Sequence, residues 1–264
     1  MVILGLVQGL TEFLPVSSTA HLIFAESFLG IPRPGILLEA VLHLGTVVAA
    51  IVLFRDDIRR LLSGWWSTFD HPPGDVRTAY RRLAWLILLA TAVTAAIGLL
   101  FADQFERMYG SLRGVAIQLM LTGVILLFTR ERGTRQITEI GVSDAAMLGL
   151  TQGISIIPGI SRSGATIAGG IWVGLRRDEA ARLSFLIAIP SVAGAGLFGL
   201  KDLQAGAALG YGPSQLAVGF AVSLVSGIVA IKWLLSWVRR GRLGVFAAYC
   251  FIVGAGVLTL TFRG

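Results

Sequence analysis

The stretch Gln8-Gly-Leu-Thr-Glu-Phe-Leu-Pro-Val-Ser-Ser-Thr-Ala-His21 places polar and ionisable side chains inside an apolar N-terminal region. A second stretch, Gln152-Gly-Ile-Ser-Ile-Ile-Pro-Gly-Ile-Ser-Arg-Ser-Gly-Ala-Thr166, does the same in the other half of the chain. In each case about eleven apolar residues lead to a polar turn with a proline, and a second short apolar segment follows. Such half-length segments cannot cross a bilayer singly, so regions 1–30 and 142–173 are predicted to be re-entrant helical hairpins.

The remaining sequence is typical of an all-α polytopic membrane protein. Of its 264 residues, 55% are hydrophobic and 14% charged, whereas a soluble domain averages about 25% charged. Six further segments are long and apolar enough to span a bilayer. They are residues 36–54, 81–101, 113–129, 181–199, 215–233 and 244–262. The single cysteine, Cys250, excludes an internal disulfide and a thiolate metal site.

The two hairpin regions resemble each other. Gly5-Leu-Val-Gln-Gly9 matches Gly149-Leu-Thr-Gln-Gly153, and Ser17-Ser-Thr19 falls on Ser161-Arg-Ser163 after a one-residue offset. Because each hairpin precedes three spans, we predict a duplication, with repeat one at 1–130 and repeat two at 142–264. Three crossings are an odd number, so the second repeat is expected to be inverted relative to the first.

The basic residues predict the orientation of this arrangement. Sixteen lie in connections on one side of the predicted membrane and five on the other, with Arg162 inside the second hairpin. The positive-inside rule makes the richer side cytoplasmic and puts both termini outside. The first hairpin then enters from outside and the second from the cytoplasm, so that their tips meet near the midplane. We therefore attribute the net charge of +7 to the orientation of the protein in the membrane and not to nucleic-acid binding.

Arg162 is the most informative ionisable residue in the second hairpin. It stands between Ser161 and Ser163 at the predicted start of a half-helix, and Thr166 is three residues beyond Ser163. A guanidinium grips phosphate with two parallel hydrogen bonds, and a helix N-terminus adds free N–H groups and positive dipole. The pattern predicts an anion site, with phosphate preferred. The alternative is a structural ion pair of Arg162 with Glu12.

The first hairpin carries candidate acid–base and nucleophilic groups. Gln8 and Glu12 are four residues apart, so they share a helix face that could hold Mg²⁺ or Ca²⁺, position a base, or form an internal hydrogen bond. His21 follows Ser17 and Ser18 at helical spacing. An imidazole there can serve a hydroxyl nucleophile or protonate a leaving phosphate. Ser18 is the preferred nucleophile, and water is the rival.

A second acidic and imidazole pair stands early in the first long span. Glu39 and His43 are four residues apart there. We interpret them as a packing or cavity-wall pair, and contact with a substrate is the less favoured alternative.

The stretch from Gln8 to His21 resembles the first signature of the undecaprenyl-diphosphatase family of the bacitracin-resistance type. That signature has Glu or Gln, three residues, Glu, and then Pro-x-Ser-Ser-Thr-x-His. Pro158-Gly-Ile-Ser-Arg-Ser-Gly-Ala-Thr166 resembles the second signature, and the resemblance extends over essentially the whole chain. It implies two interlocked inverted repeats with six transmembrane helices and two re-entrant hairpins. It also implies hydrolysis of undecaprenyl diphosphate to undecaprenyl phosphate and inorganic phosphate, which recycles the lipid carrier for peptidoglycan and confers bacitracin resistance.

The resemblance also assigns roles to residues. It implies catalytic roles for Glu12, Ser18, His21 and Arg162. Diphosphate-binding roles fall on Ser17, Thr19, Ser161, Arg162, Ser163 and Thr166. A divalent cation, Mg²⁺ or Ca²⁺, is implied with Glu12 and Gln8 as ligands, although many members carry Glu at the position of Gln8.

The expected partner is a polyprenyl diphosphate lipid, and the expected location is the bacterial plasma membrane with the site opening outward. A homodimer is left open. From the residues alone, the alternative function is an inverted-repeat transporter or flippase for a phosphorylated lipid or an anion.

Overall fold

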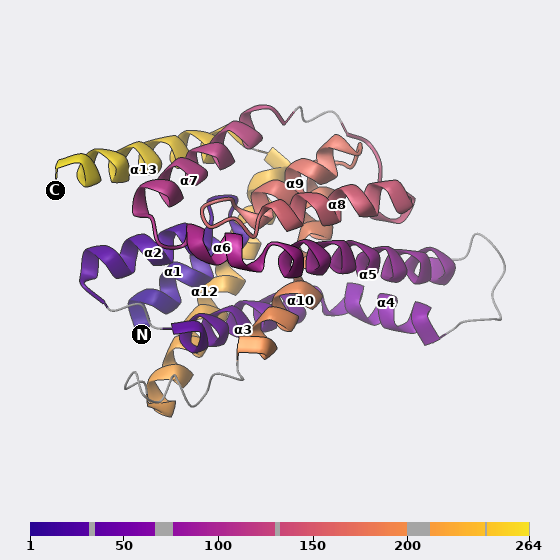
Figure 1. Ribbon diagram of the computed structural model, residues 1–264. Coiled ribbons are helices and arrows are strands. Elements are labelled where there is room, and N and C mark those ends of the chain that lie inside the picture. Colours follow the sequence, from indigo (N-terminus) through magenta and orange to yellow (C-terminus); the bar gives the residue numbers. More distant parts are fainter. Residues whose placement is uncertain (32–34, 67–75, 130–132, 200–211, 241, 264) are drawn as a thin grey trace.

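The computed structural model describes residues 1–31, 35–66, 76–129, 133–199, 212–240 and 242–263. Within these residues the chain forms twelve α-helices and one short 3₁₀ helix, η1 (Ile137–Glu139). Figure 1 shows how the α-helices are arranged. Apart from one isolated bridge between Arg135 and Leu175, the regular structure of the described residues is helical. The predicted all-α class is confirmed.

The two proline-containing stretches each form a pair of short helices. In the first, α1 (Val2–Phe13) is followed by α2 (Ser18–Leu29), and in the second α8 (Val142–Ile154) is followed by α9 (Arg162–Trp172). The breaks fall where the sequence predicts them, because a proline disfavours helical backbone in the residue before it. A serine then caps each second helix: Ser17 Oγ accepts from the Ala20 N–H at 3.3 Å, and Ser161 Oγ accepts from the Gly164 N–H at 3.1 Å.

Six longer helices coincide with the six predicted spans. They are α3 (Gly35–Leu53), α5 (Val76–Leu100), α7 (Leu112–Leu127), α10 (Arg177–Gly199), α12 (Pro213–Arg240) and α13 (Gly244–Arg263). In the described residues, four are long and apolar enough to cross a membrane alone, and two more crossings result if each of two bent helix pairs is one span. The chain is therefore a multi-pass membrane protein.

The bent pairs contain two helices that the sequence analysis did not predict. Helix α4 (Arg55–Trp66) leaves α3 at 79°, and α6 (Ala102–Met108) meets α7 at 105°. Among the described residues of α4 only Asp57 and Gly64 are buried, and α6 has no buried residue. Amphipathic or exposed helices of this kind are missed by a search for uninterrupted apolar segments.

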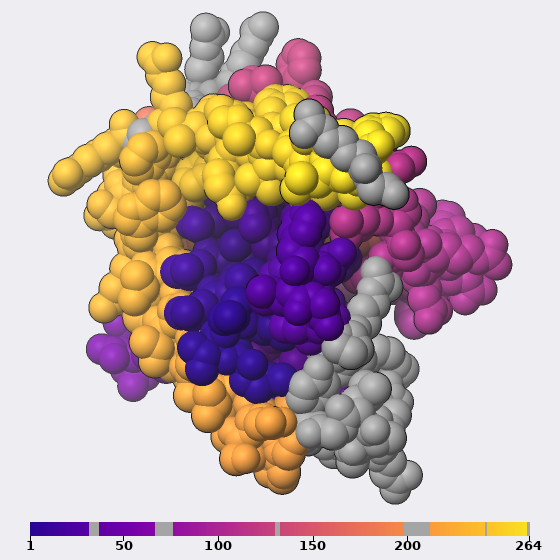
Figure 2. All heavy atoms as spheres, turned by 90° about the vertical axis from the view of Figure 1, so that its left-hand side faces the viewer, coloured from indigo at the N-terminus to yellow at the C-terminus, as the bar shows by residue number. Residues whose placement is uncertain are grey.

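Helices from the two halves of the chain are packed against each other. Helix α1 packs on α12, α8 on α5, α13 on α7 and α10 on α3. The approach of α1 to α12 is close: a Cβ at Gly9 would lie 2.0 Å from Ser226 Oγ. Figure 2 shows the N-terminal helices filling the centre of one face, with C-terminal segments above, to the left of and below them. This interleaving brings the two proline-containing breaks together.

Candidate active site

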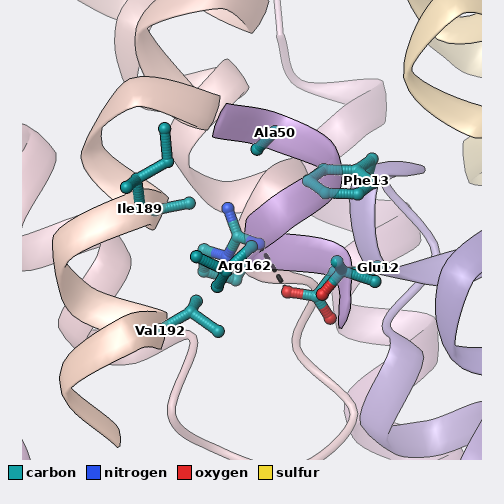
Figure 3. A pocket seen from close by; sticks show the side chains of 9 residues that line it. Glu12, Phe13, Ala50, Arg162, Ile189 and Val192 are labelled. Atoms are coloured by element: carbon teal, nitrogen blue, oxygen red, sulfur yellow. Dashed lines mark hydrogen bonds and ion pairs between the residues drawn. The ribbon is translucent and has the colours of Figure 1, made fainter. Parts of the chain in front are cut away.

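An ion pair joins the two hairpins. Arg162, the first residue of α9, donates from Nη2 to Glu12 Oε1 at 2.6 Å, and Figure 3 shows the two side chains meeting beside α10. The side chains of Arg162 and Glu12 are 15% and 5% exposed. The prediction that the two breaks converge is thus confirmed for their charged residues.

Glu12 receives hydrogen bonds at its other oxygen too. Its Oε2 accepts from Ser18 Oγ at 2.6 Å and from Gln8 Nε2 at 2.9 Å. His43 Nε2 lies 3.6 Å from the same oxygen. The helical spacing of Gln8 and Glu12 predicts the contact between these two side chains. His43 comes from α3, and no spacing in the sequence indicates its approach.

The start of α2 has an unusual backbone. Ser17 has a φ of 65°, and it is the only non-glycine residue of the described chain with a positive φ. Such a conformation costs about 1–3 kcal/mol and is found mostly at functional sites. It lets the Ser17 hydroxyl cap α2 while Ser18, the first residue of the helix, turns its hydroxyl to Glu12.

His21 contacts Ser17 and not the Ser18 hydroxyl. Its Nδ1 lies 2.8 Å from the Ser17 carbonyl oxygen, and because a carbonyl only accepts, Nδ1 carries the hydrogen. Its Nε2 lies 2.8 Å from the hydroxyl of Tyr249 on α13, and the two rings stack at 13°. Both ring nitrogens are therefore occupied by groups other than the candidate nucleophile. Tyr249 is a contact that the sequence analysis did not anticipate.

The polar residues around Arg162 divide into two groups. Ser161 lines the main cavity together with Arg162. Ser163 donates to the Leu14 carbonyl at 2.8 Å, and the Thr166 hydroxyl donates to the Arg162 carbonyl at 2.7 Å. The Ser163 hydroxyl thus links the second hairpin to the first, and the Thr166 hydroxyl bonds within α9 and contacts Ser184 on α10, while Ser161 and Arg162 line the cavity.

A cavity of about 710 Å³ adjoins these groups. Six of the predicted site residues line it: Glu12, Ser17, Ser18, Thr19, Ser161 and Arg162. Arg162 Nη1 is buried and has no hydrogen-bond partner among the described residues. This unused donor and the hydroxyls of the hairpin turns suit an oxyanion ligand.

The predicted divalent-cation ligands do not form a cation centre by themselves. Gln8 turns its NH₂ group, and not its oxygen, toward Glu12, and both oxygens of Glu12 already face N–H or O–H donors. In the described part of the chain, no group of three or more His, Cys, Asp or Glu side chains is placed to hold a metal ion. Mg²⁺ and Ca²⁺ require several oxygen ligands, which these two residues do not supply.

The fold and the site define a class: a multi-pass membrane protein in which two broken helices bring a guanidinium, a carboxylate and several hydroxyls to one cavity. Residues 1–256 match the family described as bacitracin resistance protein BacA. An undecaprenyl-diphosphatase of Methanobrevibacter smithii is 38% identical, over 96% of this chain and 94% of its own length. One from Rubrobacter xylanophilus is 42% identical, over 98% and 96%. The chain belongs to the BacA family.

Proposed function

We propose that this protein is an integral membrane phosphatase that hydrolyses undecaprenyl diphosphate to undecaprenyl phosphate and inorganic phosphate. One observation carries the proposal: the Ser18 hydroxyl and the Arg162 guanidinium bind the two oxygens of one carboxylate, Glu12, in the lining of a cavity of about 710 Å³. A candidate nucleophile, a candidate base and a guanidinium that can bind phosphate are thus adjacent. The relatives named above are undecaprenyl-diphosphatases, which agrees with this chemistry.

Ser18 is the proposed nucleophile, and Glu12 is the proposed base. Because Ser18 Oγ already donates to Glu12 Oε2 at 2.6 Å, the carboxylate can take the proton as Oγ attacks the terminal phosphorus. The bond from that phosphorus to the bridging oxygen breaks, and undecaprenyl phosphate leaves with the bridging oxygen. Glu12 returns the proton to the departing phosphate, and water then hydrolyses the phosphoserine to release inorganic phosphate.

Arg162 and the two helix N-termini are proposed to hold the diphosphate. Nη2 of Arg162 stays on Glu12 while Nη1 has no protein partner, so a turn of the guanidinium toward the cavity lets Nη1 donate to a phosphate oxygen. Helices α2 and α9 both begin at this point, at Ser18 and Arg162, so two positive dipole ends act on the same anion. Charge stabilisation of this kind supplies most of the rate in phosphoryl transfer. Ser17, Thr19 and Ser161 add polar groups to the same cavity lining.

His21 is proposed to support the site through its neighbour. Its Nδ1 hydrogen bond to the Ser17 carbonyl holds the strained residue that precedes the nucleophile. Of the two residues predicted to move protons, Glu12 contacts the Ser18 hydroxyl directly, so we assign the first proton transfer to Glu12. We propose that Ser163 and Thr166 serve the diphosphate indirectly, by fixing the turn from which Arg162 projects.

We infer that the chain consists of two inverted repeats, at 1–130 and 142–264. Matched glycines support this inference. A Cβ at Gly5 would lie 2.9 Å from the Gly219 carbonyl oxygen, and a Cβ at Gly149 would lie 2.7 Å from that of Ala90. The pair α1 and α12 is therefore paralleled by the pair α8 and α5. On this basis we propose that the hairpins are re-entrant from opposite sides. The excess of basic residues in the connections on one side then supports termini outside a bacterial plasma membrane and a site that opens outward.

Two further expectations remain proposals. Since Glu12 and Gln8 do not build a cation centre, we propose that Mg²⁺ or Ca²⁺ arrives bound to the diphosphate, whose oxygens provide most of its ligands. Dimerisation also stays a prediction, and the mass of the purified protein in detergent checks it.

Phosphate release from undecaprenyl diphosphate by the purified protein in detergent tests the proposal. It distinguishes a phosphatase from a transporter, because a transporter moves its ligand without hydrolysing it. We expect turnover by the wild type and loss of turnover in Arg162→Ala, with Arg59→Ala on the exposed face of α4 as the matched control. Ser18→Ala tests the covalent route against Ser63→Ala, since Ser63 is exposed. Near-normal turnover of Ser18→Ala would assign the attack to water, and no turnover by folded wild type would refute the function.

A further inference from the structure

The large cavity has a second set of polar groups, separate from Glu12, Ser18 and Arg162. Three helices contribute side-chain oxygens to its lining: α5, α8 with its C-cap residue, and α10. The residues are Thr91, Thr94, Gln152, Ser155 and Ser191, and we refer to them as the acceptor wall. The proposed phosphatase mechanism assigns none of them a role.

The hydroxyls of the acceptor wall have no hydrogen left to donate to the cavity. Each one donates to a backbone carbonyl three or four residues earlier, at 2.8 Å for Thr91, 2.9 Å for Thr94, 2.6 Å for Ser155 and 3.1 Å for Ser191. A hydroxyl has a single hydrogen and two lone pairs. What these four groups can offer a ligand is therefore lone pairs only.

Gln152 adds an acceptor that has no partner. Its Nε2 donates one hydrogen to Thr94 Oγ1 at 3.0 Å and the other to Ser191 Oγ at 2.8 Å. The residue is 2% exposed, and its Oε1 is buried without a hydrogen-bond partner in the described residues. Reversing the amide would set its oxygen against two hydroxyls whose hydrogens are already used, so the observed orientation is the favoured one. Gln152 differs from the other buried amides of this kind, such as Gln118, in lying in the lining of the cavity together with further acceptors, so its oxygen can serve a ligand there.

The charge of the wall indicates what kind of ligand it takes. All five side chains are uncharged and present oxygen lone pairs. Helix α8 ends beside them, so the negative end of its dipole makes the electrostatic potential at the wall more negative. An anion would be repelled there. Divalent cations in proteins are usually held by carboxylates, and the wall has none. Uncharged oxygens beside the C-terminal end of a half-length helix are instead the type of site that binds sodium in membrane transporters.

We propose that the acceptor wall binds a monovalent alkali-metal cation at the hydrogen-bonded group of Gln152, Thr94 and Ser191, with Thr91 and Ser155 in the same lining. The same cavity is lined by Arg162 and the turn residues proposed to hold the diphosphate. A cation on this wall offsets part of the negative charge of that substrate, a consequence that rests on the proposed function. Binding of the cation itself is independent of the proposed phosphatase function.

Thermal unfolding of the purified protein in detergent, without substrate, tests the proposal. The melting midpoint is measured against rising NaCl or KCl, with N-methyl-D-glucamine chloride keeping the ionic strength constant. We expect a saturable rise in wild type with at least one alkali cation. Gln152→Leu should abolish it, because leucine has no oxygen. Gln118→Leu is the matched control, since Gln118 also has a buried unpartnered Oε1 but does not line the cavity.

A measurement on the wild type alone can refute the proposal. If its melting midpoint does not respond to Na⁺ or K⁺, the acceptor wall binds water and not an alkali cation. An unchanged response in Gln152→Leu would overturn it as well. If that variant does not fold, Ser191→Ala replaces it, and the same response to the cation in Ser191→Ala and wild type would count against the site. Phosphate release in the same salts separates the two claims, because cation binding without hydrolysis refutes the proposed function and leaves the site standing.

Discussion

The buried pair of Glu12 and Arg162 allows the catalytic and the structural reading of Arg162 to be separated. We consider the single substitutions Glu12→Gln and Arg162→Met and the double substitution of both. Each single substitution leaves one buried group without its main partner, because the two side chains are only 5% and 15% exposed. Removing one member of such a pair typically costs about 3–5 kcal/mol of folding free energy.

The double substitution should recover most of that loss. With both charges removed, the new amide oxygen at position 12 can still accept from Ser18 and Gln8, and its NH₂ group faces the space that the guanidinium vacates. Replacing a buried ion pair by groups of similar volume is often close to neutral. We therefore expect the double variant to lie within about 1–2 kcal/mol of wild type, with a coupling energy of several kcal/mol.

Unfolding titrations in mixed detergent micelles measure the stabilities, and phosphate release measures activity. A double variant that is stable but at least about a thousandfold slower than wild type supports a catalytic pair, as expected for loss of a phosphate-binding arginine and a base. A double variant that is stable and active would refute the mechanism, since the pair would then serve only to hold the hairpins together.

Three further predictions follow from particular contacts. Gly9→Ala should lower the unfolding temperature strongly, because its Cβ would meet Ser226 Oγ at 2.0 Å, whereas Gly244→Ala, with no atom within 4 Å, should leave the temperature unchanged. Tyr249→Phe keeps the ring against His21 but removes the hydroxyl that bonds to His21 Nε2. Loss of one hydrogen bond costs about 1 kcal/mol or slightly more, so phosphate release should slow by about five- to tenfold. A wild-type rate in this variant would show that the hydrogen bond is dispensable. Calorimetry should detect Mg²⁺ binding only when a non-hydrolysable prenyl diphosphonate is present, and tight binding to the protein alone would contradict a cation that enters with the diphosphate.

The hairpins and spans could be predicted because their signals are local. Pro15 and Pro158 mark breaks in apolar segments, and the serines that follow are ordinary helix caps. Counting apolar residues therefore located every long helix, with ends that differ from the observed ones by up to seven residues, at the C-terminal end of α12. It failed at α4, because the hydropathy of an amphipathic helix averages out over a window.

The site could be predicted only in part, because much of it depends on contacts between distant helices. Gln8, Glu12 and Ser18 are close in the chain, and the ion pair with Arg162 follows once the two breaks are brought together. The approach of His43 to Glu12 depends on how α3 packs, and no sequence spacing carries that information.

Gln152, which also lines the cavity, has contacts that could not be predicted from the sequence either. Its position matches that of Gln8 when Gly149–Gly153 is aligned with Gly5–Gly9, yet the two amides have different partners. Gln8 donates to a carboxylate, whereas Gln152 donates to hydroxyls on α5 and α10. Identical residues at equivalent positions therefore acquire different chemistry from their neighbours.

The 150 residues that separate Glu12 from Arg162 have a consequence for synthesis of the protein in the cell. At about 5–20 residues per second, the ribosome needs roughly 8–30 s between these two positions. For that time the first hairpin exists without its guanidinium partner, and α1 must wait longer still for α12. A nascent chain of this kind needs a chaperoning environment, such as the interior of the insertion machinery, until its second half emerges. Ribosome stalling before position 162 should therefore leave the first hairpin open to proteolysis or labelling.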